Sequence, residues 1–433
     1  MIWLYRIVFL PAFVVVFPFY LRRMLKRGGY GKDFSHRWGA MPKPPAKRAG
    51  VCRVWVQAVS VGEIQAIEPL LKSLHADPRF EVVLTTTTST GYKILREKYT
   101  PLILAGGVFP IDFWLFSRRA WKKIQPDLVV LMEGELWPEH LTQAQKRKVP
   151  AVLLNGRLSD RSFVRYKKFP RLSRWVFSKL SKVLASSRED AERFAQVGVP
   201  PERVEAVGNI KFDVDYTPLN TDERAALRKS MGFGEDKSTR VLIGASTWPG
   251  EEELLLSVFA ELLKMDDNWR LLLVPRHAER RAEIVKLLEA QQEPWVQRSV
   301  IAHAEQPAKI CLADTTGELR ALMQTADLVF IGKSLPPNEG GQTPIEAAVF
   351  GIPIVYGPHM ENFRPVCASL EKAHAARRAQ DAAQAKGILL SLANSPEKRA
   401  ALSQASQTWH AANRGASERC LAALENFLPQ AHP

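Results

Sequence analysis

Two successive series of strand-like runs, each alternating with helical stretches, constrain the fold of this chain more than any other feature. The first series is VCRVWVQA (51–58), FEVVLTTTT (80–88), LVVLME (128–133), AVLLNG (151–156) and KVLASS (182–187). The second series is RVLIGAS (240–246), WRLLLVP (269–275), AKICLAD (308–314), ADLVFIG (326–332) and IPIVYG (352–357). Strands that alternate with helices usually form parallel sheets. The sequence therefore predicts two α/β domains, each built on a parallel sheet.

The segment 215–239 separates the two series, because the alternation breaks there. A chain of 433 residues is also too long for one ordinary core, which favours two domains. We place the first domain at 28–215 and the second at 216–433, the latter ending in an Ala-rich helical tail from Ala373 to about Phe427. Open α/β sheets bind ligands at the carboxyl ends of their strands. We therefore expect the two domains to face one another across a cleft.

The N-terminal segment MIWLYRIVFLPAFVVVFPFY carries Arg6 as its single charge, and the basic segment LRRMLKR follows it. A helix of about 20 residues spans roughly 30 Å, enough to cross the hydrocarbon core of a bilayer. A cleaved signal peptide would carry its basic residues before the apolar run. Here they follow it, which predicts a cytoplasmic domain. We predict a membrane anchor at 1–27, while Pro11 and Pro18 leave open whether it spans the bilayer; a buried core helix is the alternative.

Composition narrows the class of function. The net charge of +15 suits an anionic partner, whether nucleic acid, an acidic membrane or a phosphorylated substrate. The four cysteines are scattered without CxxC spacing, so they indicate neither a disulfide framework nor a zinc site. The sequence contains no HExxH motif, no P-loop and no GxGxxG after a strand. These features argue against a metalloprotease, a P-loop NTPase or a Rossmann dehydrogenase, and we expect no metal and no cofactor.

The stretch VWVQAVSVGEIQAIEPLL (54–71) runs from a strand into a helix and places Glu63 at the junction. A helix N-terminus favours the charged form of a carboxylate by about 0.3–1 kcal/mol, so we expect Glu63 to be ionised. Pro69 should kink the helix or shorten its regular part. An acid that simply caps the helix explains Glu63 as well as a catalytic acid does, and the residues alone leave both interpretations open.

Two further segments of the first half carry charges that should face the cleft. LVVLMEGELWPEHL (128–141) ends a strand with Glu133 and Glu135, and AVGNIKFD (206–213) brings Lys211 near the domain boundary. A lysine there could stabilise negative charge on a departing phosphate or on a donor carboxylate. A charge on the rim of the cleft is the alternative for each segment.

The strands of the second half end in loops suited to a phosphate or a sugar. LLLVPRHAER (271–280) delivers Pro275 and Arg276, whose guanidinium could bind a phosphate through two hydrogen bonds. GASTWPGEEELLL (244–256) places small residues before a helix, where backbone N–H groups are available to an anion. A surface arginine is the alternative for Arg276.

Two later loops have the same character. ADTTGELRAL (313–322) places threonine and glycine ahead of a glutamate at a helix start. In GKSLPPNEGGQTPIEAAVFGIPIVYGP (332–358), the glycines allow close backbone approach, and TPIE (343–346) has the form of a capping box. Glu346 either caps this helix or hydrogen-bonds a ribose diol, and the residues favour neither interpretation.

A set of short motifs occurs in one order along the chain: AVSVGE (58–63), TTTTSTG (85–91), LMEGELWP (131–138), NGRLSDRS (155–162), GNIKFD (208–213), PRHAER (275–280) and GGQTPIEAA (340–348). With these motifs the chain resembles the 3-deoxy-D-manno-octulosonic acid (Kdo) transferases of Gram-negative bacteria, from the anchor to about Phe363. The resemblance implies a GT-B fold, in which two Rossmann-like domains face a cleft and the C-terminal one holds most of the nucleotide.

The resemblance also implies a reaction. Kdo moves from CMP-Kdo to the tetraacylated disaccharide precursor of lipid A (lipid IVA), with inversion at the anomeric centre and no metal at a DxD motif. The catalytic domains would lie on the cytoplasmic side of the inner membrane. The positive charge and the anchor agree with this, because the acceptor is a bis-phosphorylated lipid at the membrane surface.

The matching motif positions imply roles for individual residues. Glu63 looks like the general base that deprotonates the acceptor hydroxyl, and Glu133 and Lys211 match positions assigned to transition-state stabilisation. The CMP-binding positions are matched by Pro275, Arg276, Thr316, Gly317, Glu318, Thr343, Pro344, Ile345 and Glu346. The chain departs from the family at two places. It has GGQT (340–343) where GGHN is usual, and it has STW (246–248), ending in Trp248, where STH is usual. Gln can still donate and Thr can still cap, so we expect CMP binding to be retained.

Two other functions are weighed against this one. A second envelope GT-B enzyme, such as a lipid A disaccharide synthase with a UDP sugar, is the alternative within the class. A membrane-tethered module that binds anionic lipid or nucleic acid without chemistry is the alternative outside it. RSFVRYKKFPRLSRW (161–175) has part of the expected mixture of basic and aromatic residues. We interpret it, with Lys167 and Lys168, as docking the acceptor lipid, and we expect no nucleic-acid partner.

Overall fold

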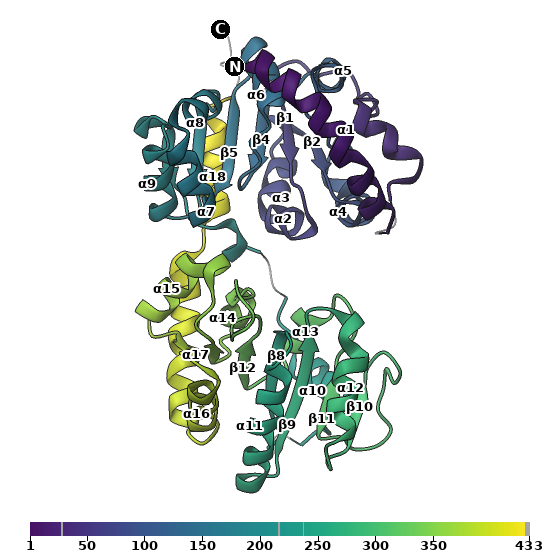
Figure 1. Cartoon of the computed structure of the whole chain (residues 1–433), viewed down its shortest axis with the longest axis vertical. Coiled ribbons are helices and arrows are strands. Elements are labelled where there is room, and N and C mark those ends of the chain that lie inside the picture. Colours follow the sequence, from purple (N-terminus) through teal and green to yellow (C-terminus); the bar gives the residue numbers. More distant parts are fainter. Residues whose placement is uncertain (27–28, 215–216, 237, 429–433) are drawn as a thin grey trace. The chain divides into compact units, whose positions relative to one another are not determined.

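The chain forms two α/β units, each built on a parallel seven-stranded sheet (Figure 1). The computed structural model describes residues 1–26, 29–214, 217–236 and 238–428. The first unit comprises Met1–Asp215 and Asn413–Pro433, and the second comprises Tyr216–Ala412. The expected domain boundary at 215 and 216 lies outside the described residues. The two Rossmann-like parallel sheets expected for a GT-B protein are confirmed.

The first sheet has the strand order β3-β2-β1-β4-β5-β6-β7. Its strands are β1 Cys52–Gln57, β2 Phe80–Thr86, β3 Ala105–Val108, β4 Leu128–Met132, β5 Ala151–Gly156, β6 Lys182–Ala185 and β7 Val204–Ala206. The predicted runs correspond to the five central strands of this order. The two edge strands were not predicted, because β3 reads AGGV, with two glycines, and β7 is three residues long.

The second sheet has the order β10-β11-β9-β8-β12-β13-β14. Its strands are β8 Arg240–Thr247, β9 Trp269–Pro275, β10 Trp295–Gln297, β11 Ile310–Leu312, β12 Leu328–Ile331, β13 Ile354–Tyr356 and β14 Ala376–Arg378. The two edge strands of this sheet, β10 and β14, were again not predicted from the sequence. The strand β14 falls inside the tail that was expected to be helical throughout, so that expectation is wrong at its start.

Helices cover both faces of each sheet (Figure 1). Those of the first unit are α1 Ile2–Lys26, α2 Val61–Ala66, α3 Glu68–Ala76, α4 Ser89–Ile94, α5 Trp114–Ile124, α6 Pro138–Lys146, α7 Asp160–Lys168, α8 Pro170–Phe177, α9 Arg188–Gln196 and α18 Ala416–Glu425. The others are α10 Thr221–Ser230, α11 Glu251–Met265, α12 Arg281–Glu289, α13 Leu319–Met323, α14 Ile345–Val349, α15 Arg364–Lys372, α16 Ala382–Ala393 and α17 Pro396–Asn413. As predicted for Pro69, the helix after Glu63 is broken at Ile67, and the proline occupies the first turn of α3.

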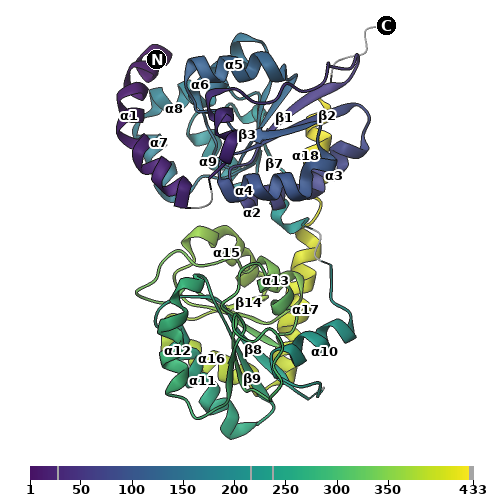
Figure 2. The same cartoon turned by 90° about the vertical axis from the view of Figure 1, so that its right-hand side faces the viewer.

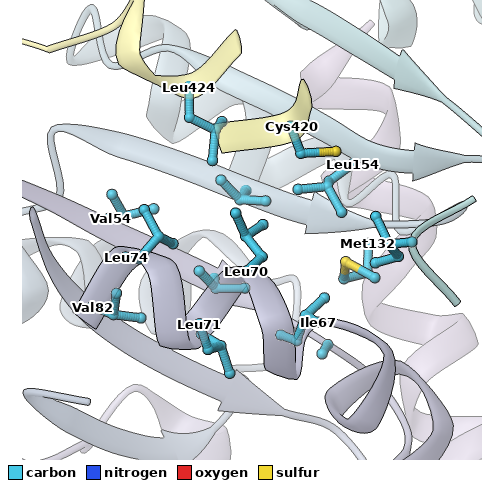
Figure 3. Packing of buried hydrophobic residues seen from close by; sticks show 14 of the residues in the cluster. Val54, Ile67, Leu70, Leu71, Leu74, Val82, Met132, Leu154, Cys420 and Leu424 are labelled. Carbon is cyan, nitrogen blue, oxygen red and sulfur yellow. The ribbon is translucent and has the colours of Figure 1, made fainter. Parts of the chain in front are cut away.

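The last helix, α18, completes the core of the first unit. Figure 3 shows Cys420 and Leu424 from α18 beside Val54 and Leu154 of the sheet and Leu70 of α3, and all five side chains are buried in one apolar cluster. The expected second domain, 216–433, is therefore wrong at its C-terminal end. An amphipathic pattern shows that a helix has an apolar face, but it does not identify the sheet that this face covers.

The N-terminal helix α1 is long and apolar enough to cross a membrane. Pro11 and Pro18 lie inside it without interrupting it. The last residue of the expected anchor, residue 27, lies outside the residues that the structure describes. Figure 2 shows α1 running along the side of the first unit, to which it belongs.

Candidate active site

Glu63 lies in the first turn of α2, directly after β1. Ser60 is the N-cap of this helix, and its Oγ accepts a hydrogen bond from the Glu63 backbone N–H at 3.4 Å. The Glu63 carboxylate bends back, so that Oε2 accepts a hydrogen bond from the Val59 N–H at 2.7 Å and Oε1 lies 3.3 Å from the Ser60 hydroxyl. The side chain thus caps the helix start and is held in one orientation by the same contacts.

Burial raises the pKa of the Glu63 carboxyl to about 7. The hydrogen bonds from Val59 and Ser60 and the charge of Lys211 act in the opposite direction, while the charge of Glu133 raises the pKa further. At neutral pH Glu63 is therefore only partly ionised, because desolvation opposes the stabilisation of its charged form at the helix N-terminus. A carboxyl with a pKa near 7 exchanges protons readily at neutral pH, which is the property that general acid–base catalysis requires.

Glu133 and Lys211 form an ion pair in the same unit. Glu133 follows β4 in a left-handed conformation with φ of +53°, and Lys211 lies in the short 3₁₀ segment Ile210–Phe212. The Lys211 Nζ donates to Glu133 Oε1 at 2.6 Å. Burial alone would raise the pKa of Glu133, but the charges of Lys211 and Arg157 outweigh it, and the pKa lies below its usual value. The structure therefore brings these two predicted residues together as a charged pair that acts on Glu63.

Glu135 is a further acid of this group, and no role was assigned to it from the sequence. Burial raises its pKa to about 7, and the charges of Glu63 and Glu133 raise it as well. The Trp137 indole N–H donates to its Oε2 at 2.7 Å. The sequence signal was present, since two glutamates separated by one glycine follow β4. Their proximity to Glu63 depends on strand pairing, because β1 and β4 are neighbours in the sheet.

Asn155 supports the segment that carries Lys211. This fully buried residue lies in β5 with φ of +53°, and its Oδ1 accepts a hydrogen bond from the Ile210 N–H at 3.3 Å. The contact fixes the residue that immediately precedes Lys211. The motif NGRLSDRS contained Asn155, but its supporting role could be found only from the structure.

The predicted residues of the second unit follow the carboxyl ends of its strands. Pro275 ends β9 and is buried, whereas Arg276 is exposed and its backbone N–H donates to the Thr247 carbonyl at 3.1 Å. Thr316 and Gly317 form the exposed turn before α13, and Gly317 has φ of +92°. The backbone of this turn is therefore accessible from solvent.

Glu318 is the N-cap of α13. Its carboxylate accepts two hydrogen bonds from the Arg298 guanidinium, at 2.8 and 2.9 Å, and one from the Thr315 hydroxyl. The Arg298 contact is the largest influence on Glu318 and keeps its pKa below the usual value. Glu318 is thus a paired anion that shapes the turn at Thr316 and Gly317.

The capping box expected at TPIE (343–346) is absent. The helix α14 begins at Ile345 with Pro344 as N-cap, and the Thr343 Oγ1 accepts from the Ile345 N–H at 3.3 Å. Because the proline occupies the N-cap and not the first helical position, Glu346 is one residue too early to reach back to the helix start. Its Oε1 lies instead 3.5 Å from Arg320 of α13, and burial raises its pKa.

The glycines before α14 are required by packing inside the unit. A Cβ at Gly340 would lie 2.5 Å from the Asn362 side chain, and one at Gly341 would lie 2.4 Å from Met360 Sδ. Both have positive φ, +102° and +68°. The Gly-rich turn is therefore explained by the chain's own contacts, whatever ligand it also approaches.

Trp248, one of the two departures noted in the sequence, lies among cationic and aromatic side chains after β8. Its ring meets the His277 ring edge-on at a centroid distance of 5.2 Å. The Lys333 Nζ lies 4.9 Å from the centroid of the indole ring. An indole that holds a lysine and an imidazole at the ends of three neighbouring strands can contribute to an anion-binding surface.

Comparison with known proteins identifies the family of this chain. Residues 32–214 match the family described as 3-Deoxy-D-manno-octulosonic-acid transferase (kdotransferase). The 3-deoxy-D-manno-octulosonic acid transferase of Haemophilus influenzae is 31% identical, over 97% of this chain and 95% of its own length. The protein of the same name from Bordetella pertussis is 33% identical, over 94% of this chain and 95% of its own.

A solved structure, the UDP-GlcNAc 2-epimerase of Neisseria meningitidis bound to UDP-GlcNAc, has a TM-score of 0.57 at 13% identity and covers 86% of this chain and 100% of its own. At that identity the likeness concerns the fold alone. The two relatives, by contrast, match almost end to end. The chain therefore belongs to the 3-deoxy-D-manno-octulosonic acid transferase family of glycosyltransferases.

Proposed function

We propose that the enzyme transfers Kdo from CMP-Kdo to the tetraacylated disaccharide precursor of lipid A, with inversion at the anomeric centre. Family membership supports Kdo transfer in lipopolysaccharide biosynthesis. The observation that carries the mechanism is a carboxyl with a pKa of about 7, Glu63, next to the Glu133–Lys211 ion pair at the carboxyl edge of the first sheet.

In the proposed reaction, the ionised Glu63 carboxylate removes the proton of the acceptor sugar hydroxyl. The hydroxyl oxygen forms a bond to the anomeric carbon of Kdo from the face opposite the phosphate. The bond between that carbon and the phosphate oxygen breaks, and CMP departs with the electron pair. One base suffices for this inverting transfer, and the hydrogen bonds from Val59 and Ser60 orient the carboxylate for it.

Lys211 and Glu133 are assigned to transition-state stabilisation. The ammonium group of Lys211 stabilises negative charge on the departing phosphate or on the Kdo carboxylate. Glu133 holds this ammonium group at 2.6 Å, and its positive φ turns the side chain out of the strand direction. We assign Glu135 to the same site, where its raised pKa adds a second proton-exchanging group.

The second unit is assigned to CMP binding. The exposed Arg276 suits the phosphate, and the accessible backbone at Thr316 and Gly317 suits an anion or a sugar hydroxyl. Glu346, with Arg320 beside it, accepts hydrogen bonds from the ribose diol. The remaining assigned positions, Pro275, Glu318, Thr343, Pro344 and Ile345, shape these loops.

We assign the enzyme to the cytoplasmic side of the inner membrane, with α1 as its anchor. The apolar helix and the net charge of +15 support this assignment, because the acceptor lies at an anionic membrane surface. The basic helix α7 supports a role in acceptor docking, since Lys167 and Lys168 are exposed there beside Val164, whose side chain is 65% exposed.

The test is an incubation of the purified enzyme with CMP-Kdo and the tetraacylated precursor, followed by mass spectrometry of the lipid. We expect mass increments of one or more Kdo residues, release of CMP, loss of both with Glu63→Gln, and retention of both with Glu97→Gln, which changes an exposed glutamate of the same unit. Glu63→Gln should still bind CMP-Kdo. An equal loss of donor affinity would contradict the assignment of the base, and competition by UDP but not CMP would contradict the donor.

A further inference from the structure

One face of α1 is fitted to the first unit along the middle of the helix. Side chains four residues apart, Phe9, Phe13 and Phe17, point to the unit, as expected for one stripe of a helix. The Phe9 ring stacks on Phe113 at a centroid distance of 6.0 Å, and Phe13 and Phe17 contact Trp38 at 6.4 and 5.9 Å. This stripe is therefore a packing surface within the protein.

The start of α1 is held by two polar contacts to buried acidic residues. The Tyr5 hydroxyl donates to Asp112 Oδ2 at 2.6 Å. The Arg6 guanidinium donates to both carboxylate oxygens of Glu139, at 2.8 and 2.9 Å. Glu139 is 0% exposed. If α1 moved away from the unit, this carboxylate would lose the arginine that pairs with it, which is unfavourable.

The other end of α1 is held as well. The Tyr20 and Tyr30 hydroxyls lie 3.2 Å apart, and Met24 is buried in a small apolar cluster with Tyr30 and Tyr92. The helix is therefore attached to the first unit at both ends and in the middle, consistent with its course in Figure 2. A helix that crossed the bilayer upright would have to give up these contacts along most of its length.

The opposite face of α1 is apolar and exposed. Its large side chains are more than half exposed: Trp3, Leu4, Ile7, Val8, Leu10, Val14, Val15, Val16 and Phe19. Two exposed apolar residues of α5, Trp114 and Leu115, extend this outer face. They directly follow Phe113, which contacts Phe9 of α1. An exposed apolar face of this length needs a cover other than water.

The flanking charges favour a membrane as that cover. Arg118 and Arg119 are exposed on α5, and Arg22 is exposed near the end of α1. An apolar stripe bordered by exposed arginines is typical of helices that lie in the interface of an anionic membrane, with the apolar face at the boundary of headgroups and acyl chains. A second copy of the protein would bring like charges together around the stripe.

We infer that α1 is an in-plane anchor: its outer face enters one leaflet, its inner face stays on the first unit, and both of its ends remain on the same side of the membrane. The inference rests on the proposed membrane association and specifies its geometry. The inner stripe and the buried Arg6–Glu139 pair carry it, because a spanning helix would expose both to lipid.

Cysteine cross-linking in isolated inner membranes tests the docked position of α1. The four native cysteines are buried, so added pairs can be followed. We expect Phe9→Cys with Phe113→Cys to be linked by a short bifunctional methanethiosulfonate reagent, because the two rings that they replace stack on each other; the link is detected as a joined peptide by mass spectrometry. Val15→Cys with Phe113→Cys is the control and should not be linked, because Val15 points outward and is 66% exposed. Failure of the first pair to link in folded, membrane-bound protein would overturn the inference.

Topology is tested with a short hydrophilic extension that carries one cysteine before Met1. In intact spheroplasts, a membrane-impermeant maleimide should leave it unlabelled, and labelling should appear once the inner membrane is opened. Labelling from outside would mean that α1 spans the bilayer and would overturn the inference, while association with the membrane would stand.

Vesicles of phosphatidylethanolamine and phosphatidylglycerol test the outer face. Val15→Asp with Phe19→Asp should lower the fraction of protein that co-sediments by more than about tenfold. Val300→Asp, at a residue 72% exposed in the second unit, is the control and should bind as the native protein does. Unchanged vesicle binding by the double variant would overturn the inference. The inference would also fail if the native protein proved to be a dimer in solution and the double variant a monomer. Failure of the native protein to bind vesicles would contradict the membrane association itself.

Discussion

Glu63→Gln should abolish transfer and, at the same time, stabilise the first unit at alkaline pH. The pKa of Glu63 rises from an ordinary value of 4.5 to about 7 in the folded protein. The folded state therefore holds this proton more tightly than the unfolded state. The resulting stability is fully present below pH 4.5 and is lost as the pH rises through about 7. At 1.36 kcal/mol per pKa unit, the loss amounts to about 3 kcal/mol as an upper value.

Glutamine carries no ionisable proton, keeps the shape of the side chain and can still accept from the Val59 N–H. It should therefore resemble the protonated acid, with little effect at pH 5 and a stabilisation of roughly 1–3 kcal/mol at pH 8.5, the range allowing for solvent access to the half-buried side chain. Hydrogen exchange of β1 and β4 peptides measures the opening free energy within the first unit. Glu97→Gln controls for the loss of one exposed carboxyl group. A difference between Glu63→Gln and the native protein that does not grow with pH would refute the reasoning.

Three further predictions concern the ion pair, its support and the acceptor. Lys211→Met should raise the pKa of Glu133, which loses its nearest cation, and should lower kcat by about 10²–10³, measured with saturating donor. Asn155→Ala leaves the backbone N–H that precedes Lys211 without its acceptor and should destabilise the first unit by about 1–3 kcal/mol, measured by urea unfolding. Replacing Lys167 and Lys168 together by alanine should raise the KM for the lipid and leave the KM for CMP-Kdo unchanged.

Each of these has a result that would count against it. Lys229→Met, at a lysine 68% exposed in the second unit, should leave kcat unchanged, and an equal loss there would show that the effect is not local. An Asn155→Ala variant that unfolds at the same urea concentration as the native protein would show that this contact does not stabilise the first unit. If donor and lipid KM values rise together in the Lys167 and Lys168 variant, the helix does not act on the acceptor alone.

The central strands of both sheets could be predicted because their residues are apolar and buried on both faces. The edge strands β3, β7, β10 and β14 could not, since short or Gly-containing segments become strands only through pairing with a neighbour. The placement of α18 was missed for a similar reason, because its partner α3 lies more than 300 residues earlier in the chain.

The sequence predicted which residues lie together in the candidate site, but it did not predict their protonation. Sequence motifs identified Glu63, Glu133 and Lys211, and the structure brings them together in the first unit. The raised pKa of Glu63 depends on burial, which is a tertiary property. At TPIE (343–346), a helix start was predicted correctly, but the expected capping box is absent, because the proline occupies the N-cap and not the first helical position.

The position of α18 has a consequence for how this enzyme is made. The second unit, Tyr216–Ala412, is inserted between the two parts of the first unit, so the first unit begins before it and ends after it. A chain stopped at residue 214 would lack Cys420 and Leu424 and would leave an apolar face of its sheet uncovered. During synthesis, the part that emerges first from the ribosome thus completes its core last, after the inserted unit has had time to fold. Release of the final helix then becomes the step that finishes the unit carrying Glu63.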